Sequence, residues 1–489
     1  MPEHDVIVVG AGNAALAAAV SAREQGARRV LVLEKAPEEL RGGNTHYSGG
    51  LFRFAFDDGE DLRALVPDAE RRIPDFFADV APYPRALFWD DLRRVTEGRA
   101  DPELGEILIG RSYDTVKWMA GKGIVLEPAL SLSGVRVGGK IKWSPGAVIR
   151  AEHEGVGLSS GWFEIAERAG VEIRYGTSAV RLTQDRGGRV TGVTTHGARG
   201  FEDVTAGAVV LGCGGFEANA AWRARYLGRP WDHAKVRGTR YNTGDGLRMA
   251  IELQALAVGQ WTGCHSTPID ADAPPYGDRK LTDKTNRLSY PYGVLVNRRG
   301  RRFFDEGEDF QFYTYAKLGG IILNEPGGVG YQIFDAKVEP LLEGRYKTGT
   351  PLVADTLPGL VAQLSLDQAV ARRTLDDYNA AVSAGAFDPT VKDGLATKGL
   401  DLPKSNWAQR LDTPPYSAYP VTGGITFTFG GVRINERAQV IGTSWTPIAG
   451  LYACGEMVGG LFHGNYPGGT GLMSGAVFGR IAGAFAASD

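Results

Sequence analysis

The stretch DVIVVGAGNAALAAAVSAREQG, residues 5–26, and the run RRVLVLEK that follows it at residues 28–35 decide the fold of this chain. The first run is short, apolar and β-branched, as expected for a parallel strand buried on both faces. A glycine turn and an alanine-rich segment come next, and the second apolar run ends at Glu34. We therefore predict a strand, a helix that ends near Gln25 and a second parallel strand.

The glycine turn of this unit matches a dinucleotide fingerprint. Gly10 permits a tight turn, Gly12 lets the backbone approach a pyrophosphate, and Ala15 replaces a third glycine where helix and strand pack closely. The start of the helix offers N–H groups to the phosphates, and Glu34 can accept a hydrogen bond from a ribose hydroxyl. The alternative is a packing turn without a nucleotide. We favour the dinucleotide and expect it to contact Gly10, Gly12, Asn13, Ala14, Ala15, Glu34 and Lys35.

Glycine-rich stretches elsewhere indicate which dinucleotide it is. RGGNTHYSGG, residues 41–50, follows the second strand, where a nicotinamide-binding domain usually enters another helix directly. AVVLGCGGFEAN, residues 208–219, and PIAGLYACGEMVGG, residues 447–460, are further strands that end in glycines. FHGNYPGGTGLMSGAVFGRIAG, residues 462–483, predicts a late helix whose positive N-terminal end would stabilise the negative charge of a reduced flavin. These features favour FAD, and a nicotinamide dehydrogenase is the alternative.

The composition is that of a globular protein, with 43% apolar and 23% charged residues, and 489 residues suggest two domains. The net charge of -3 gives no reason to expect a nucleic-acid partner. No stretch approaches the about 20 apolar residues of a membrane helix, the N-terminus has no basic leader, and the three cysteines show no metal-ligand spacing. We predict a cytoplasmic protein without a metal site or membrane span. Its expected partners are a small-molecule substrate and an unidentified electron acceptor, and its oligomeric state stays open.

Taken together, these motifs give the chain a family resemblance. It resembles the flavoprotein family of fumarate reductases and succinate dehydrogenases, which also contains the 3-ketosteroid Δ1-dehydrogenases. The matching stretches are GAGNAALAAA (10–19), LEK (33–35), GGNT (42–45), GCGGFEAN (212–219), NTGDGLRMA (242–250), GGVRIN (430–435), GLYACGE (450–456) and GGTGLMSGAVFGRIAG (468–483). Within the family the chain is most similar to the tricarballylate-dehydrogenase branch, on GCHSTP (263–268), DEGEDFQFYTYAK (305–317) and NYPGGTGL (465–472).

The resemblance implies an α/β fold with two domains. We expect a Rossmann-like, doubly wound FAD-binding domain formed by residues 1–263 and 424–489. An α+β cap domain, residues 264–423, is expected to be inserted between them and to carry substrate-binding groups. The active site would lie between the two domains, where hinge closure can exclude water.

The resemblance also extends the expected FAD site. The family's flavin-linked histidine would fall at Gly43 and not at His46, so we predict FAD that is bound without a covalent link. Asp245 is expected in a helix-capping or structural role. The further cofactor-binding residues that we expect are Gly42, Gly43, Asn44, Thr45, Ser48, Gly49, Gly50, Val180, Cys213, Gly214, Gly215, Asn219, Asp245, Gly455, Glu456, Gly469, Gly471, Leu472 and Ser474.

The candidate catalytic residues depart from the fumarate-reductase pattern. His265 and His463 match two substrate-binding histidines of the family, but the arginine expected after His463 is replaced by Tyr466. Gln311, with Phe310 before it, stands where the family has its proton-donating arginine, and a glutamine side chain does not titrate. The ketosteroid dehydrogenases use tyrosines for this step, so we expect Tyr466 to bind a substrate carbonyl and Tyr313 or Tyr315 to take a proton. The alternative is that these tyrosines only pack, with their hydroxyls at the surface.

We therefore predict an FAD-dependent oxidoreductase that desaturates, or reduces, a carbon–carbon bond next to a carbonyl or carboxylate, resembling a tricarballylate dehydrogenase or a ketone dehydrogenase. Hydride would pass to flavin N5 and a tyrosine would remove the proton. The alternatives are a fumarate-reductase-like enzyme, a flavin oxidase and a flavin-binding subunit without turnover of its own. Arg279, Lys280 and Arg287 lie in one predicted cap loop, where they could bind a carboxylate, although solvation is the simpler interpretation.

Overall fold

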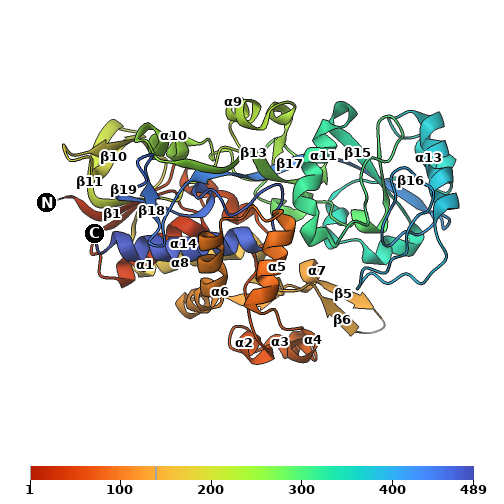
Figure 1. Ribbon diagram of the computed structural model, residues 1–489, viewed down its shortest axis with the longest axis horizontal. Helices are drawn as coiled ribbons and strands as arrows, with labels where there is room; N and C mark the ends of the chain where they lie inside the picture. The colour runs from red at the N-terminus through yellow and green to blue at the C-terminus, as the bar shows by residue number, and fades with distance from the viewer. Residues whose placement is uncertain (1, 138–139) are drawn as a thin grey trace.

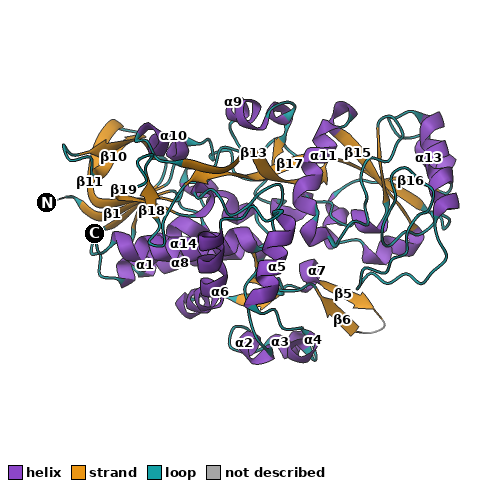
Figure 2. Cartoon of the chain, in the orientation of Figure 1, coloured by secondary structure: helices purple, strands orange, loops and turns teal. Residues whose placement is uncertain are grey.

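The computed structural model describes residues 2–137 and 140–489. It is elongated, with an α/β body at one end that holds both termini, a second body at the other end, and a helical lobe between them on one side (Figure 1). Figure 2 shows that strands run through both bodies, whereas the lobe is mainly helical.

The first body is built on a mainly parallel sheet, as predicted. β1 lies at its centre between β11 and β2, and Val6 pairs with Ala208 on one side and Val30 on the other. β18 is antiparallel at one edge, and β9 and β10 extend β11 as an antiparallel ribbon. The strands are β1 (His4–Val9), β2 (Val30–Leu33), β8 (Glu172–Arg174), β9 (Ser178–Gln184), β10 (Val190–Gly197), β11 (Gly200–Leu211), β18 (Gln439–Ile441) and β19 (Pro447–Ala453). Because β1, β2, β11 and β19 run in the same direction, the loops after them meet at one edge of the sheet.

Helices α1 (Asn13–Glu24), α8 (Glu154–Arg168) and α14 (Thr470–Ala486) cover one face of this sheet (Figure 1). α1 and α14 come from opposite ends of the chain and pack without room for side chains at their crossing. A Cβ atom on Gly479 would lie 2.3 Å from the carbonyl oxygen of Ala14, and one on Gly483 would lie 2.0 Å from that of Ala18. Glycines in α14 therefore fix the distance between the two helices. Two short helices, α9 (Ala220–Trp222) and α10 (Asp245–Glu252), follow β11.

The second body is the predicted cap, and two long strands join it to the first. β13 (Ala257–Asp270) and β17 (Tyr416–Val432) pair antiparallel along their length and cross from one body into the other (Figure 1). The boundaries predicted at residues 264 and 423 fall inside these strands. The other strands and α-helices of the second body are β12 (Lys235–Val236), β14 (Val294–Asn297), β15 (Val329–Asp335), β16 (Leu352–Ala354), α11 (Tyr315–Asn324), α12 (Leu357–Val361) and α13 (Gln368–Ala381).

The helical lobe is an insertion in the first body that the sequence did not reveal. Its long helix α6 begins with a capped turn, in which the side chain of Asp101 accepts from the N–H groups of Glu103 and Leu104, and ends at Gly123 in a left-handed conformation. The lobe contains β3 (Leu51–Phe52), α2 (Gly59–Arg63), α3 (Ala69–Arg72), α4 (Phe76–Asp79), α5 (Arg85–Val95), α6 (Pro102–Lys122), β4 (Leu126–Pro128), α7 (Leu130–Ser133), β5 (Gly134–Val137), β6 (Lys140–Trp143) and β7 (Ile149–Ala151).

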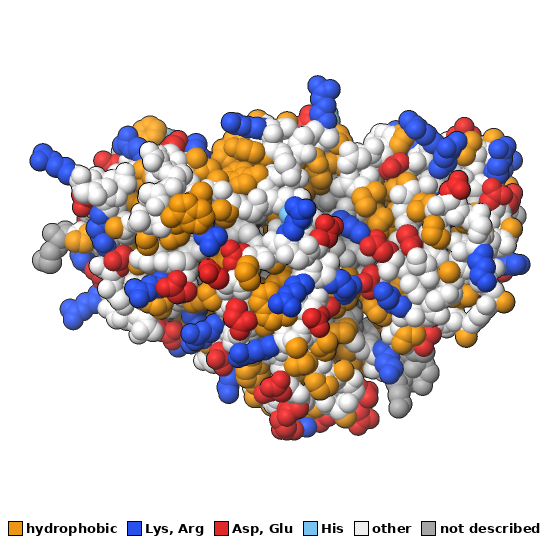
Figure 3. All heavy atoms as spheres, viewed as in Figure 1, with side chains coloured by type: hydrophobic (Ala, Val, Ile, Leu, Met, Phe, Trp, Pro, Cys, Tyr) orange, Lys and Arg blue, Asp and Glu red, His pale blue; other side chains and the backbone are white. Residues whose placement is uncertain are grey.

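The surface mixes both signs of charge. Figure 3 shows acidic and basic side chains interspersed over the visible face, with hydrophobic side chains between them. Among the residues described, no helix combines the length and the apolar character that crossing a bilayer requires.

We expect Gly483→Ala to lower the free energy of unfolding by about 2–3 kcal/mol, because the added methyl group has to displace the α1 backbone at Ala18. The measurement is urea unfolding of the FAD-bound protein. Gly121→Ala in α6 is the control, since a Cβ there meets no atom within 4 Å; it should be neutral or stabilising by up to about 1 kcal/mol. Equal stability of Gly483→Ala and the parent protein would contradict this account of the helix crossing.

Candidate active site

One cavity extends from the edge of the parallel sheet to the cap. Its walls come from loops after β1, β2 and β11, from the start of α14, and from cap residues near α11 and β17. Most of the predicted cofactor residues line it: Gly10, Gly12, Asn13, Ala14, Glu34, Lys35, Gly43, Asn44, Thr45, Ser48, Gly49, Cys213, Gly214, Asp245, Gly455, Glu456, Gly469, Gly471, Leu472 and Ser474.

At the first end of the cavity, the backbone is shaped to receive a phosphate. Gly10 has φ of +100°, and a Cβ atom there would lie 2.6 Å from the carbonyl oxygen of Gly212, so only glycine fits. α1 begins at Asn13, whose N–H donates to the hydroxyl of Thr45 at 2.8 Å, and the N-cap residue, Gly12, has no side chain to cap the helix. The next N–H groups of the first turn and the positive end of the helix dipole lie at the cavity, which fits a pyrophosphate. Glu34, which is buried at the end of β2, lines the same wall.

A second helix N-terminus opens into the same cavity. α14 begins after Gly469, which has φ of +88°, and its N-terminus also has no side-chain cap. Asn13 joins the two helix starts: its amide donates to the carbonyl oxygen of Leu472 at 2.8 Å, and its Oδ1 accepts from the indole of Trp162 at 2.8 Å. Two uncapped helix ends at one cavity suit a long ligand with phosphates at one end and an electron-accepting ring at the other. The residues present thus fit FAD.

A few predicted cofactor residues do not line this cavity, and they pack against protein instead. Ala15 faces Gly212, and Cβ atoms on Gly42, Gly50 and Gly215 would meet Ser159, the backbone of Glu154 and the carboxyl of Glu456. Asn219 caps α9 by accepting from the N–H of Trp222. The carbonyl of Val180 accepts from Arg248. Six predicted cofactor residues therefore pack behind the residues that line the cavity: Ala15, Gly42, Gly50, Val180, Gly215 and Asn219. Asp245 does line the cavity, at the first residue of α10, where it pairs with Lys35 at 2.7 Å.

Two carboxyl groups, Glu217, which is buried, and Glu456, which is half-buried, fix the loops around the cavity. Glu456 accepts from the N–H of Thr428 at 2.6 Å, and Glu217 accepts from the side-chain amides of Asn44 at 2.7 Å and Asn242 at 2.6 Å. Burial raises the pKa of both carboxyl groups, and the neighbouring Glu456 raises that of Glu217 further. The pair therefore holds segments that lie far apart in the sequence against β17.

On the cap side, two phenol groups meet in the cavity wall. Tyr315 is the first residue of α11, and Tyr466 lies in the loop before α14. Their hydroxyl oxygens are 2.5 Å apart, and both side chains are buried. Burial raises the pKa of both phenols; for Tyr466, the hydrogen bond from Tyr315 and the charge of Arg237 act in the opposite direction. Aromatic rings of Phe312, Phe427 and Phe462 surround the pair.

The other predicted catalytic residues do not line the cavity. Tyr313 points toward the lobe, where its hydroxyl donates to Asp91 at 2.7 Å, and Gln311 lies in the preceding turn. His265 packs behind the phenol pair, with its ring centroid 4.8 Å from that of Tyr466, and burial lowers its pKa so that it is neutral. His463 is partly buried near the same loop.

Charged cap residues that the sequence analysis missed line the cavity beside the phenols. Arg237 and Arg345 both pair with Asp283, and Asn286 donates to the same carboxylate at 2.6 Å. These positions carry no motif, and they meet only in the folded cap. The simpler interpretation of Arg287, a solvated side chain, is wrong. Arg287 is 1% exposed and pairs with Asp270 at 2.6 Å, because the loop folds inward.

Comparison with known proteins agrees with this geometry. A family model described as an FAD binding domain matches residues 5–472. The chain is 29% identical to a fumarate reductase (cytochrome) of Shewanella frigidimarina, over 99% of this chain and 77% of that protein. It is 27% identical to a 4-oxocyclohex-2-ene-1-carboxylate 5-dehydrogenase of Sinomonas cyclohexanicum, over 98% of this chain and 93% of that protein.

Solved structures show the same fold. The open conformation of a flavocytochrome c3 fumarate reductase superposes with a TM-score of 0.74 at 27% identity, covering 100% of this chain and 79% of that one. The 3-ketosteroid Δ1-dehydrogenase of Sterolibacterium denitrificans gives a TM-score of 0.75 at 20% identity, covering 99% of both chains. The chain belongs to the FAD-binding flavoprotein family of the fumarate reductases, as predicted, and is an FAD-dependent oxidoreductase.

We predict that acid denaturation releases all of the FAD. His46 is buried, does not line the cavity, and its pKa is lowered to about 4 by burial and by Arg279, whereas Gly43, the position expected for a flavin-linked histidine, lines the cavity. The measurement is flavin absorbance in the supernatant after acid precipitation, compared with the absorbance before it. Flavin that stays with the protein pellet, in a peptide that contains His46, would contradict this prediction.

Proposed function

We propose that this protein is an FAD-dependent dehydrogenase that desaturates a carbon–carbon bond next to an activating carbonyl group. The observation that carries the proposal is the contact of 2.5 Å between the hydroxyls of Tyr315 and Tyr466 in the wall of the flavin cavity. Desaturation removes a proton from the carbon next to the carbonyl and a hydride from the following carbon. Bound FAD supplies the hydride acceptor.

Tyr466 is the better placed of the two phenols to take the proton. Its phenolate would be stabilised by the hydroxyl of Tyr315, by the N–H of Gly469 and by the charge of Arg237. Tyr315 lacks comparable support, because its main hydrogen-bonding neighbour is the other phenol, which raises its pKa further. Tyr315 then acts as the donor that holds Tyr466 in place and stabilises its charge. Phe312, Phe427 and Phe462 keep this part of the site apolar.

The residue at the position of the family's catalytic arginine disfavours fumarate reduction in which an arginine donates the proton. The position where the family has that arginine is Gln311, which has no titratable proton and does not face the cavity. The dehydrogenase of Sinomonas cyclohexanicum, whose name describes an oxo carboxylate, supports a substrate with a ketone. A reductase that uses Tyr466 as the acid is the second candidate, and the relatives named fumarate reductase favour it.

We expect cyclohexanone, added to the protein under anaerobic conditions, to bleach the flavin absorbance and to yield the conjugated enone. Tyr466→Phe should slow bleaching by about 100-fold or more while FAD content is unchanged, because a proton acceptor is lost. Tyr315→Phe should slow bleaching less. Because Tyr313 lies outside the cavity, the bleaching rate of Tyr313→Phe should stay within about threefold of the parent rate. Equal rates for the parent protein and Tyr466→Phe would remove Tyr466 from the mechanism.

The rate of bleaching should also rise with pH. A phenol takes a proton only as its phenolate, and burial raises the pKa of both phenols above the ordinary value of 10.0. The ionised fraction is therefore small at neutral pH and grows with each unit of pH. We expect the logarithm of the rate to increase with a slope of about 1 up to pH of about 10, and Tyr466→Phe to lose this slope. A flat profile in the parent protein would argue against a tyrosine base.

A further inference from the structure

We infer that Arg237 and Arg345 form a carboxylate-binding subsite, so that the substrate carries a carboxylate as well as the activating ketone. The inference rests on the proposed function, because both arginines line the cavity that holds the phenol pair. Neither arginine belongs to a motif in the sequence. They come from the segment after β12 and from a turn between β15 and β16.

Arg237 lines the cavity and has one edge without a described partner. The residue is 9% exposed, and its Nε donates to Thr426 at 3.0 Å. Its Nη1 donates to Asp283 at 2.6 Å and to the carbonyl oxygen of Tyr47 at 3.3 Å. Among the described residues, its Nη2 has no hydrogen-bond partner. A buried guanidinium with a free N–H edge is poised for an oxygen anion that the protein does not supply.

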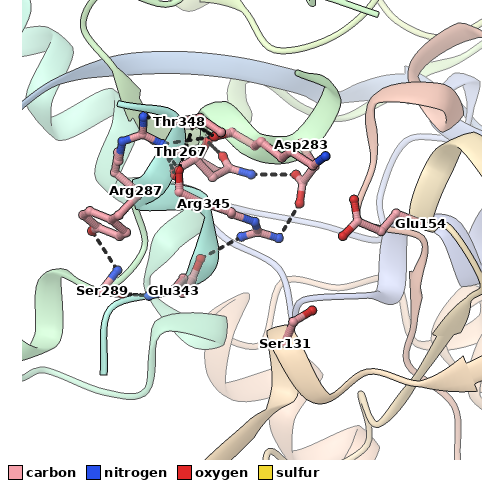
Figure 4. Close-up of polar contacts among 12 residues, drawn as sticks. Ser131, Glu154, Thr267, Asp283, Arg287, Ser289, Glu343, Arg345 and Thr348 are labelled. Atoms are coloured by element: carbon pink, nitrogen blue, oxygen red, sulfur yellow. Dashed lines mark hydrogen bonds and ion pairs between the residues drawn. The ribbon is translucent and has the colours of Figure 1, made fainter. Parts of the chain in front are cut away.

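Arg345 binds the same carboxylate, that of Asp283, as Arg237 does. Figure 4 shows its guanidinium between Asp283 and Glu343, with Arg287 and its partners to one side. Nη1 donates to Glu343 at 3.1 Å and Nη2 to Asp283, which leaves the remaining N–H groups without described partners. A Cβ atom on Gly49 would lie 3.6 Å from Nη2, so the guanidinium touches the loop that lines the FAD site. The two protein carboxylates thus fix its plane and leave donors toward the cavity.

The protein's own carboxylates use only part of the donors of the two arginines. Asp283 is one carboxylate shared by both guanidinium groups, and Glu343 accepts from Nη1 of Arg345 at 3.1 Å. The Arg287 guanidinium is paired with Asp270, and Glu154, the other acid near Arg345, is held by Arg150 at 3.0 Å. A ligand carboxylate would therefore accept from N–H groups of the pair that no described protein oxygen occupies.

The cavity that holds these arginines and the phenols also has apolar walls. Leu288, Phe312, Phe427, Leu461 and Phe462 line it, and the three phenylalanines pack against the phenols. A ligand that reaches both ends needs an apolar body, an acidic C–H next to a carbonyl at Tyr466 and a carboxylate at the guanidinium pair. A keto carboxylate with a ring or short hydrocarbon chain has this layout, whereas a ketone without charge leaves the arginines unpaired.

The test uses calorimetric titration of the oxidised, FAD-bound protein with benzoate and with benzamide, which have the same shape and differ in charge. Neither compound can be desaturated, so binding is measured apart from turnover. We expect benzoate to bind about 30-fold tighter than benzamide, and Arg237→Gln and Arg345→Gln each to remove most of that ratio. Arg372→Gln, an exposed arginine on α13, should keep it. If a Gln variant fails to hold FAD, Arg237→Lys and Arg345→Lys take its place, with a smaller loss of the ratio because the charge stays and the fork is lost.

Equal affinity of the two compounds for the parent protein would overturn the subsite, and so would a preference for benzoate that survives in both Gln variants. The proposed function is judged separately, because bleaching by cyclohexanone is measured on the parent protein and needs no carboxylate; Arg372→Gln should bleach at the parent rate. A benzoate preference without bleaching by any ketone would keep the subsite and reject the ketone chemistry.

Discussion

The structure depends on bringing two helix N-termini from opposite ends of the chain to one place. The N-cap residues of α1 and α14 are glycines, Gly12 and Gly469, and the first turns of both helices lie at the same cavity. Asn13 ties the start of one helix to the start of the other, and glycines along α14 let the two backbones pack at contact distance. Bulky side chains at the crossing would move one helix end away from the ligand. The dense packing is therefore a condition for binding both ends of one cofactor.

The cap contributes part of the cavity wall, and its position follows from the long strand pair. β13 and β17 run from the FAD-binding body into the cap, with register shifts near Cys264, so the two bodies share one sheet element instead of a flexible linker. Tyr315 comes from the cap and Tyr466 from the body, 151 residues apart in sequence, and they meet across this junction. The contact of the two phenols, on which the proposed proton transfer depends, forms only when the two bodies are correctly placed.

Buried charge around the substrate side is organised as shared pairs. One aspartate, Asp283, holds two arginines, and Glu217 and Glu456 accept from side-chain amides and a backbone N–H. Removing ions from water is costly unless hydrogen bonds replace the lost hydration. These bonds replace part of the lost hydration, while Oε2 of Glu217 has no described partner and one edge of Arg237 stays open. The unpaired donors of Arg237 are the basis for the inferred carboxylate subsite.

The sequence alone determined the cofactor-binding half, because its signals are local. A buried strand, a glycine turn, an uncapped helix and a terminal acid lie within 35 residues, and each restricts the backbone or the charge directly. The same holds for the glycines that open α14. The tertiary structure alone decided which tyrosine lines the cavity, since Tyr313 and Tyr315 are two residues apart in the sequence but contact Asp91 of the lobe and Tyr466, respectively. It alone brought Arg237, Asp283 and Arg345 together, because side chains from separate loops meet through packing, which has no period or spacing in the sequence.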